Sequence, residues 1–356
     1  MIYKQLTSLP IIFQVDENIY YKVDAFLKKN NLFFFKILAV SGKNKSLEFA
    51  KTLSNKLNCD NYIIENNSFD DVEFLKNQCL ERNIDLIISI GGGKVQDTVK
   101  RVSYLININH ISIPTIISND GLISPISVLK NNISNKTESV SGMMPMGVII
   151  DLNIINQAPV KYIKAAAGDI LSNLSATNDW VLAKENNNDI INDMSFLMSK
   201  SSANSLVYFS KKDFRFKPFL KQIIQGQINS GIAMSLAGTS RPCSGSEHLI
   251  SHAIDNLNIG LSILHGEQVA SISLFSLFLQ GKLIEDHLLY ALETNIELDF
   301  TNNLKIFNES ISGQIFTKSK EMRPGRYTVL DTITKDLFIS KIVDFRFFIH
   351  NRIISK

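Results

Sequence analysis

The chain has 356 residues, 45% of them hydrophobic and 20% charged, which fits an ordinary soluble protein with room for two domains. Its formal net charge of +3 supplies no basic stripe of the kind that nucleic-acid binding needs. No apolar run approaches the roughly 18–20 residues that cross a bilayer, and the first residues lack the pattern of a signal peptide. Three cysteines without metal-type spacing predict reduced thiols. We therefore expect a cytoplasmic protein with no nucleic-acid partner and no membrane insertion.

Strand-like and helix-like segments alternate in the first part of the chain. Strands are expected at 37–40, 62–64, 84–90, 111–114 and 148–151, and helices at 46–57, from Ser68 onward and at 95–106. The strand at 84–90 is apolar at nearly every position, as is typical of the middle of a parallel sheet that is covered on both faces. This alternation predicts an α/β, Rossmann-like domain with a parallel sheet at residues 1–158.

After Pro159 the strand pattern fades and helical periodicity dominates to the end of the chain. Helices are expected at 170–184 and 268–279. The second is apolar but too short to span a membrane, so we interpret it as a buried core helix. We predict an all-helical C-terminal domain at residues 159–356.

A run of three glycines and a lysine, Gly91 to Lys94, follows the strand at 84–90 and precedes a helix. Missing Cβ atoms let the backbone approach a phosphate, whose charge the free N–H groups and the helix dipole favour. A tight structural turn would have the same sequence. The run is not the G-x-G-x-x-G pattern, and no acidic residue follows the first strand's turn, so NAD and NADP both stay open.

Residues 114–125 follow the next strand and place hydroxyls, an amide and the carboxylate of Asp120 at the carboxyl edge of the sheet. Open α/β sheets bind their ligands at this edge. A polar turn capped by Asp120 is the structural alternative.

Three of the six histidines lie within eighteen positions. His248 and His252 are four residues apart, so they share one helix face, and His265 follows soon after. Imidazoles that converge with a carboxylate bind divalent metal ions well. Asp169 is a candidate carboxylate, although by itself it could simply stabilise a helix N-terminus.

Several motifs in this order resemble the sn-glycerol-1-phosphate dehydrogenases, within the wider group of dehydroquinate synthase-like and iron-containing alcohol dehydrogenase-like proteins. The motifs are Gly-Gly-Gly-Lys at 91–94, Pro-Thr-x-x-Ser-Asn-Asp-Gly-x-x-Ser-Pro at 114–125, Gly-Asp-x-x-Ser-Asn-x-x-Ala-x-x-Asp-Trp at 168–180, Ser-Gly-x-Ala-Met-Ser at 230–235, Ser-Arg-Pro-x-Ser-Gly-Ser-Glu-His at 240–248, His-Gly-Glu-Gln-Val at 265–269 and Arg-Tyr-Thr-Val-Leu at 326–330. The resemblance covers nearly the whole chain and implies the dehydroquinate synthase-like fold.

The resemblance also implies roles for individual residues of the helical domain. Asp169, His248 and His265 match the family's metal ligands, usually for zinc. Asp120, Asp169 and His252 match positions that face the substrate, and Asp120 or His252 is a plausible proton relay.

Positions in the α/β domain match contacts to the nicotinamide cofactor, NAD or NADP. They are Gly91, Gly92, Gly93, Lys94, Val95, Thr115, Ser118 and Ser124. Ile116 and Ile117 replace smaller residues that are common in the family, and Cys243 stands where alanine is common.

The activity implied is reversible, metal-dependent reduction of dihydroxyacetone phosphate to sn-glycerol 1-phosphate by NADH or NADPH, a reaction that in archaea serves phospholipid metabolism. Arg241, with the hydroxyls of Ser240, Ser244 and Ser246, could hold the substrate phosphate, or it could brace the helix start. Three alternatives are a dehydrogenase of glycerol or another polyol or sugar phosphate, an NAD- and zinc-dependent cyclase like dehydroquinate synthase, and a silent nucleotide-binding protein. A homo-oligomer is compatible with the sequence, which does not fix the assembly state.

Overall fold

The computed structural model describes residues 9–133 and 136–354, with only the backbone of Asp120, Ile353 and Ile354. The chain divides into two compact units, Met1–Pro159 and Val160–Lys356. The α/β class of the first unit and the helical nature of the second are as predicted.

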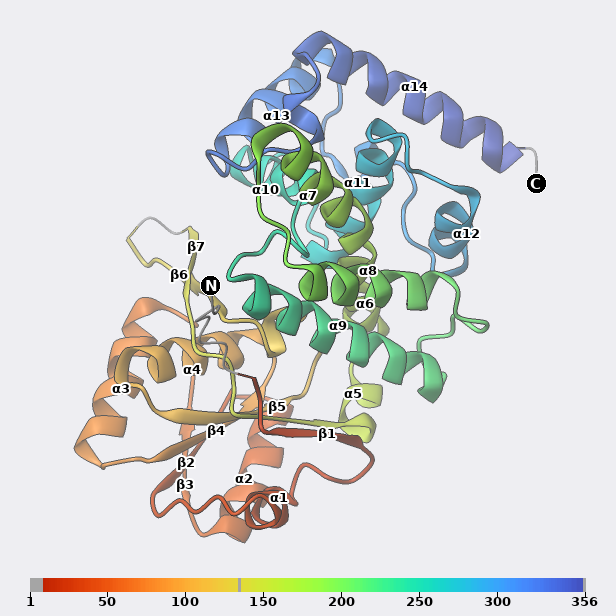
Figure 1. The fold of residues 1–356 in the computed structure, drawn as a ribbon. Helices are drawn as coiled ribbons and strands as arrows, with labels where there is room; N and C mark the ends of the chain where they lie inside the picture. Colours follow the sequence, from red (N-terminus) through yellow and green to blue (C-terminus); the bar gives the residue numbers. More distant parts are fainter. Residues whose placement is uncertain (1–8, 134–135, 355–356) are drawn as a thin grey trace. The chain divides into compact units, whose positions relative to one another are not determined.

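Unit 1 is built on a six-stranded parallel sheet with the strand order β1-β8-β5-β4-β2-β3 (Figure 1). Its strands are β1 (Ile12–Asp16), β2 (Ile37–Ser41), β3 (Asp60–Ile63), β4 (Leu86–Gly91), β5 (Asn109–Pro114) and β8 (Gly147–Asp151). Every residue of β4 is buried, in agreement with its uninterrupted apolar sequence and its central place between β2 and β5.

Two helices cover each face of this sheet. One core cluster joins the sheet to α1 (Val23–Lys29) and α2 (Lys45–Leu57), and a second joins the opposite face to α3 (Phe69–Glu81) and α4 (Gly93–Ile106). The Ser68 hydroxyl accepts from the Asp71 N–H while the Asp71 carboxylate accepts from the Ser68 N–H, so a capping box starts α3 at the expected residue. A short helix, α5 (Leu152–Gln157), follows β8.

Several elements of unit 1 were not expected from the sequence: β1, α1, α5 and an antiparallel hairpin made of β6 (Ile126–Lys130) and β7 (Thr137–Ser141). β7 is mostly exposed and lacks the alternation of apolar and polar residues that marks a half-buried strand, so a strand could not be predicted there. Between β5 and β6 the chain makes a single 3-10 turn, η1 (Asp120–Leu122).

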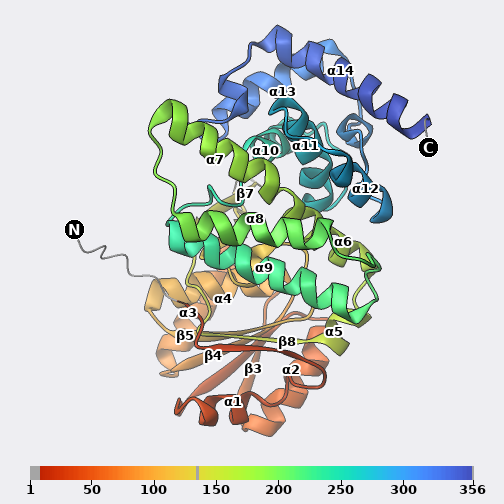
Figure 2. The same ribbon diagram turned by 45° about the vertical axis from the view of Figure 1, so that its right-hand side comes forward.

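The described part of unit 2 consists of α-helices and two 3-10 turns joined by loops (Figure 2). They are α6 (Val160–Leu171), α7 (Asn173–Asn187), α8 (Asp193–Val207), α9 (Lys217–Ala237), α10 (Ser246–Asn256), α11 (His265–Leu279), α12 (Glu285–Glu293), η2 (Phe300–Asn303), α13 (Glu309–Glu321), η3 (Val329–Asp331) and α14 (Lys335–Ile354). α6 packs along α11, and α10 packs between α11 and α13. These contacts position the histidine cluster.

The helix that carries Asp169 differs from the expectation. Helical structure begins at Val160 and α6 ends at Leu171, so Asp169 lies in its last turn and not at a helix N-terminus. The alanines at 165–167 are strong helix formers that extend α6 up to this point. The dipole explanation for Asp169 is therefore wrong, because a carboxylate near a helix C-terminus gains nothing from the macrodipole.

Candidate functional site

Three side chains from three helices of unit 2 form a cluster suited to a metal ion. Asp169 in α6, His248 in α10 and His265 at the start of α11 each offer one ligand atom, and these atoms lie within 4.8 Å of one another. His248 Nε2 is 3.8 Å from Asp169 Oδ1, and the two imidazole ring centres are 5.2 Å apart. Residues far apart in the sequence thus reach one common point.

Two glycines allow α6 and α11 to approach closely enough for this convergence. Gly168 precedes Asp169, and Gly266 follows His265. A Cβ atom added at Gly266 would lie 2.0 Å from the Ala165 carbonyl oxygen, and one added at Gly168 would lie 2.4 Å from the Gly266 carbonyl oxygen. The helices are therefore in backbone contact beside the ligands, which only glycine permits.

The imidazoles of this cluster are held neutral. Burial, followed by the positive charges of Arg323 and Arg326, lowers the pKa of His248 to about 3. Burial is also the main reason why the pKa of His265 falls to about 4. Neutral imidazole has the lone pair that a metal ion needs, so at neutral pH these rings are ready to act as ligands.

His252 lies beside the cluster, one helical turn after His248. Its ring centre is 6.1 Å from that of His248 and 5.7 Å from that of His265, with which its ring is nearly parallel. Burial and the neighbouring histidines lower its pKa to about 2. Its place next to the three ligands is compatible with contact to a bound substrate.

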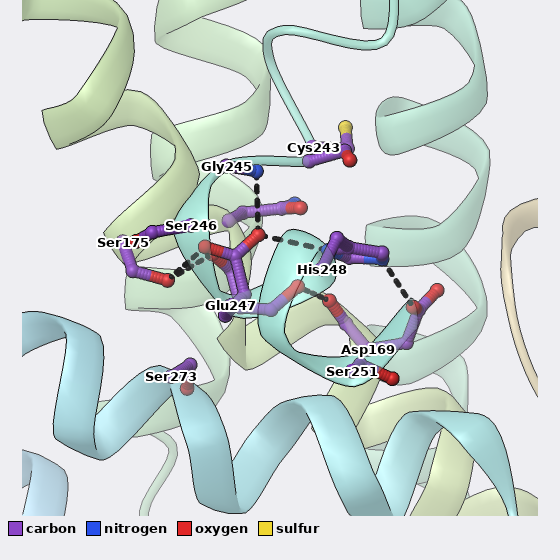
Figure 3. A network of polar contacts seen from close by, with 12 residues as sticks. Asp169, Ser175, Cys243, Gly245, Ser246, Glu247, His248, Ser251 and Ser273 are labelled. Carbon is purple, nitrogen blue, oxygen red and sulfur yellow. Dashed lines mark hydrogen bonds and ion pairs between the residues drawn. The ribbon is translucent and has the colours of Figure 1, made fainter. Parts of the chain in front are cut away.

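Glu247 holds His248 in a defined orientation (Figure 3). Its Oε1 accepts a hydrogen bond from the Gly245 N–H and lies 2.8 Å from His248 Nδ1, while its Oε2 accepts from the Ser175 hydroxyl. Because the carboxylate accepts a hydrogen bond from Nδ1–H, the lone pair of His248 is on Nε2, which faces Asp169. Such carboxylate–histidine pairs fix the tautomer of metal ligands and raise their basicity.

A second buried carboxylate supports the start of α10. Asp179 accepts hydrogen bonds from the Ser246 N–H at 2.6 Å and from the Val329 N–H at 2.8 Å, and so joins α7, α10 and η3. Burial, and next the charge of Glu247, raises the pKa of Asp179 to about 6. These bonds satisfy the first amide of α10 and fasten the turn that presents His248.

The glycine run forms the expected strand–turn–helix unit in unit 1. β4 ends at Gly91, Gly92 precedes the helix, and α4 begins at Gly93. No side chain caps α4, Gly93 is exposed, and a Cβ at Gly93 would meet nothing within 4 Å. Uncapped amides at the start of a 14-residue helix suit a phosphate group.

The segment after β5 lies beside this turn. The Thr115 N–H donates to the Gly91 carbonyl, Thr115 and Ser118 are half-buried, and Ser124 is buried. The Asp120 side chain lies outside the described part of the structure. Lys100 Nζ of α4 donates to the carbonyl oxygens of Gly121 and Ile126, and these hydrogen bonds hold the segment after β5 against α4.

Comparisons with known proteins identify the family. A family model described as iron-containing alcohol dehydrogenase matches residues 14–159. The chain is 32% identical over 336 residues to glycerol-1-phosphate dehydrogenase, NAD(P)+, of Metallosphaera sedula, covering 92% of this chain and 93% of the relative. The chain belongs to the glycerol-1-phosphate dehydrogenase family. The enzyme of the same name from Methanococcus aeolicus is 37% identical over 245 residues, which are 67% of this chain and 66% of the relative.

Solved structures show the same fold. A probable glycerol dehydrogenase from Sinorhizobium meliloti superposes with a TM-score of 0.75 at 19% identity, covering 95% of this chain and 97% of the neighbour. As an iron-containing alcohol dehydrogenase-like protein, this member of the glycerol-1-phosphate dehydrogenase family is an oxidoreductase. Among the described residues, no helix has both the length and the hydropathy of a membrane span.

The Arg241 side chain forms an ion pair and a hydrogen bond with other residues of the protein. Its guanidinium lies 2.5 Å from the Asp189 carboxylate and donates to the Tyr327 carbonyl at 2.6 Å. Both contacts favour the bracing role among the two that the sequence left open. The hydroxyls of Ser244 and Ser246 are buried and make no hydrogen bond to a described residue.

Sequence reasoning missed the groups that surround the ligands. Glu247 belongs to the Ser-Gly-Ser-Glu-His motif and Arg326 opens the Arg-Tyr-Thr-Val-Leu motif, so each was noticed without a role. Arg323 belonged to no motif. Their functions depend on contacts across α7, α10 and the loop after α13, which spacing alone does not reveal.

Proposed function

We propose that this chain reversibly reduces dihydroxyacetone phosphate to sn-glycerol 1-phosphate with NADH or NADPH and a divalent metal ion, which we assign as zinc. The convergence of Asp169, His248 and His265 in a member of the glycerol-1-phosphate dehydrogenase family is the observation that carries the proposal. Names of the relatives across several archaea indicate the same reaction.

The donor set suits a catalytic metal ion. One carboxylate and two neutral imidazoles are hard and borderline ligands that zinc accepts, and three protein ligands leave a position open for substrate. A metal ion held there would polarise the substrate ketone and stabilise the negative charge that develops on its oxygen. Glu247 would keep His248 aligned for this task through its hydrogen bond to Nδ1.

Binding of the cofactor and transfer of the proton are assigned to further residues of the two units. Unit 1 would bind the dinucleotide, with Gly91, Gly92, Gly93, Lys94 and Val95 at its phosphates and Thr115, Ser118 and Ser124 nearby. The cofactor would supply the hydride. The new alcohol needs a proton, for which His252 or Asp120, directly or through water, is the proposed relay, and Asp120, Asp169 and His252 would contact the substrate.

A coupled assay tests this function. Purified protein loaded with zinc is mixed with dihydroxyacetone phosphate and either NADH or NADPH, cofactor oxidation is followed by absorbance, and the product is resolved by chiral analysis. The expected product is the sn-1 isomer, and the His265→Ala variant should lose both bound metal and turnover. Formation of the sn-3 isomer, or turnover of the chelator-treated protein at the wild-type rate, would contradict the proposal.

A further inference from the structure

Two arginines from the loop after α13 converge on one hydroxyl. Arg323 Nη1 donates to Ser240 Oγ at 2.5 Å, and Arg326 Nη2 donates to the same oxygen at 2.9 Å. Arg326 Nη1 also donates to the Ser244 carbonyl at 2.5 Å. A hydroxyl that accepts two hydrogen bonds has its own hydrogen left to donate, so Ser240 presents a donor between two guanidinium groups.

Neither guanidinium forms an ion pair with a described carboxylate, although the buried Glu247 and Asp179 act favourably on Arg326 from farther away. Among the described residues, no carboxylate oxygen lies within ion-pairing distance of Arg323 or Arg326, whereas the nearby Arg241 is paired with Asp189 and Lys320 with Asp331. Burial, and next the charges of Arg323 and Arg241, lowers the pKa of Arg326 to about 9. Two half-buried like charges side by side are unfavourable unless an anion joins them.

The arginines line open space. A cavity of about 390 Å³ is bordered by Arg323 and Arg326, by Arg241 with its ion-pair partner Asp189, and by Trp180 and Thr239. A smaller cavity of about 150 Å³ shares Arg323 and Arg326. The larger volume lies within the range of small-molecule sites.

The arginines also reach the start of α10, the helix that carries His248. Arg326 also contacts Ser244, in the turn immediately before α10. An anionic group held by the arginines would therefore belong to a ligand near the histidines.

We propose that Arg323, Arg326 and the Ser240 hydroxyl form the subsite for the phosphate group of a phosphomonoester substrate. This inference rests on the proposed function, since it assigns the phosphate end of the molecule whose ketone meets the metal site. Guanidinium groups suit this role because they match phosphate oxygens with two parallel N–H donors. Arg241 holds the wall of the subsite through Asp189 and Tyr327 and does not bind the phosphate itself.

Arg323→Gln is the informative substitution. Among the described residues Arg323 makes one hydrogen bond, to Ser240, whereas Arg326 also holds the Ser244 backbone and its loss would disturb the turn before α10. Removing a charge-assisted hydrogen bond should raise the KM for dihydroxyacetone phosphate about ten- to a hundredfold, with a smaller change in kcat. Arg323→Lys should restore part of the affinity. Arg346→Gln, which removes a cation paired with Asp299 elsewhere in unit 2, is the matched control and should leave KM unchanged.

Binding of inorganic phosphate, measured by calorimetry on the zinc-loaded protein without substrate or cofactor, separates this inference from the proposed function. Arg323→Gln should weaken phosphate binding at least tenfold. If the variant binds phosphate as the wild type does while the wild type reduces dihydroxyacetone phosphate, the subsite assignment is wrong and the function stands. If phosphate binding depends on Arg323 but no reduction occurs, the function is wrong and the anion site stands. A rise in the KM for NADPH alone would assign the arginines to the cofactor and overturn the inference.

Discussion

The backbone contact between α6 and α11 leads to a quantitative prediction for Gly266→Ala. The added Cβ would lie 2.0 Å from the Ala165 carbonyl oxygen and 2.6 Å from its carbonyl carbon. To regain an ordinary contact the two helices must separate by about 1.4 Å, the difference between 3.4 Å and 2.0 Å. Asp169 lies on one of these helices and His265 on the other, so the separation acts directly on the distance between two candidate ligands.

Two free-energy terms oppose each other in this variant. Alanine is a better helix former than glycine by about 1 kcal/mol, which favours the substitution. Overpacking of a closed contact typically costs about 1–3 kcal/mol, and here the obstacle is backbone, which cannot rotate away. We therefore expect a net loss of stability of about 0–2 kcal/mol, the difference between those terms.

The effect on metal binding should be larger than the effect on stability. Metal–ligand distances vary by only about 0.2 Å in working sites, so a shift of an ångström removes one ligand. We expect zinc affinity to fall at least tenfold, the lower end of the effect of losing a group that supports a ligand. A competition titration against a chromophoric chelator measures the affinity, and thermal unfolding of the metal-free protein measures the stability.

Gly313→Ala is the matched control. Gly313 also lies inside a helix, but its added Cβ would meet the end of the Lys335 side chain, which can move aside. This variant should bind zinc like the wild type. If Gly266→Ala also bound zinc with wild-type affinity, close contact of the two helices would not be what assembles the cluster.

Three further predictions concern the same cluster. Glu247→Gln should keep the fold but reduce zinc affinity about ten- to a hundredfold, because the neutral amide no longer raises the basicity of His248; unchanged affinity in the competition titration would show that the carboxylate has no such role. Burial holds the pKa values of His248 and His265 at about 3 and about 4, below the ordinary 6.5, so the stability contributed by the neutral rings is complete above pH 6.5 and is lost as the pH falls from there towards 3. Urea unfolding of the metal-free protein should therefore give a smaller free energy of unfolding at pH 5 than at pH 7, and equal values would contradict the burial of these rings. Chelation should lower the Tm of the zinc-loaded wild type by several degrees and leave that of His265→Ala unchanged, since only a protein that binds the ion is stabilised by it; a similar drop in the variant would point to a different site.

The fold class could be predicted from the sequence because local hydrophobic and glycine patterns indicate its main elements. The apolar run of β4 and the glycine turn after it predicted the centre of a parallel sheet and a helix start, and both are present. The hairpin of β6 and β7 could not be found, since β7 is almost wholly exposed and β6 buries a serine while it exposes Val128. The predicted helix boundaries were least accurate where two helices adjoin. Asp169 was expected near a helix start and lies in the last turn of α6, which ends two residues before α7 begins.

Only part of the candidate site could be predicted from the sequence. Histidine spacing and the family resemblance singled out Asp169, His248 and His265, and the structure brings their ligand atoms together. The groups that orient and charge the site come from elsewhere in the chain. Glu247 acts by folding back onto the His248 ring while Ser175 of α7 holds its other oxygen, which is a tertiary arrangement with no sequence period.

The charges around the site favour a phosphorylated substrate over a neutral polyol. A divalent ion bound by Asp169 and two neutral imidazoles would keep one net positive charge, and Arg323 and Arg326, which form no ion pair with a described carboxylate, add two more. The buried carboxylates of Glu247 and Asp179 act favourably on Arg326 and offset part of this charge. A neutral triol would gain nothing from this excess, whereas a dianionic phosphomonoester is attracted by it in a partly buried site where water screens weakly. The proposed preference for dihydroxyacetone phosphate over dihydroxyacetone should therefore shrink as ionic strength rises, because added salt screens this attraction.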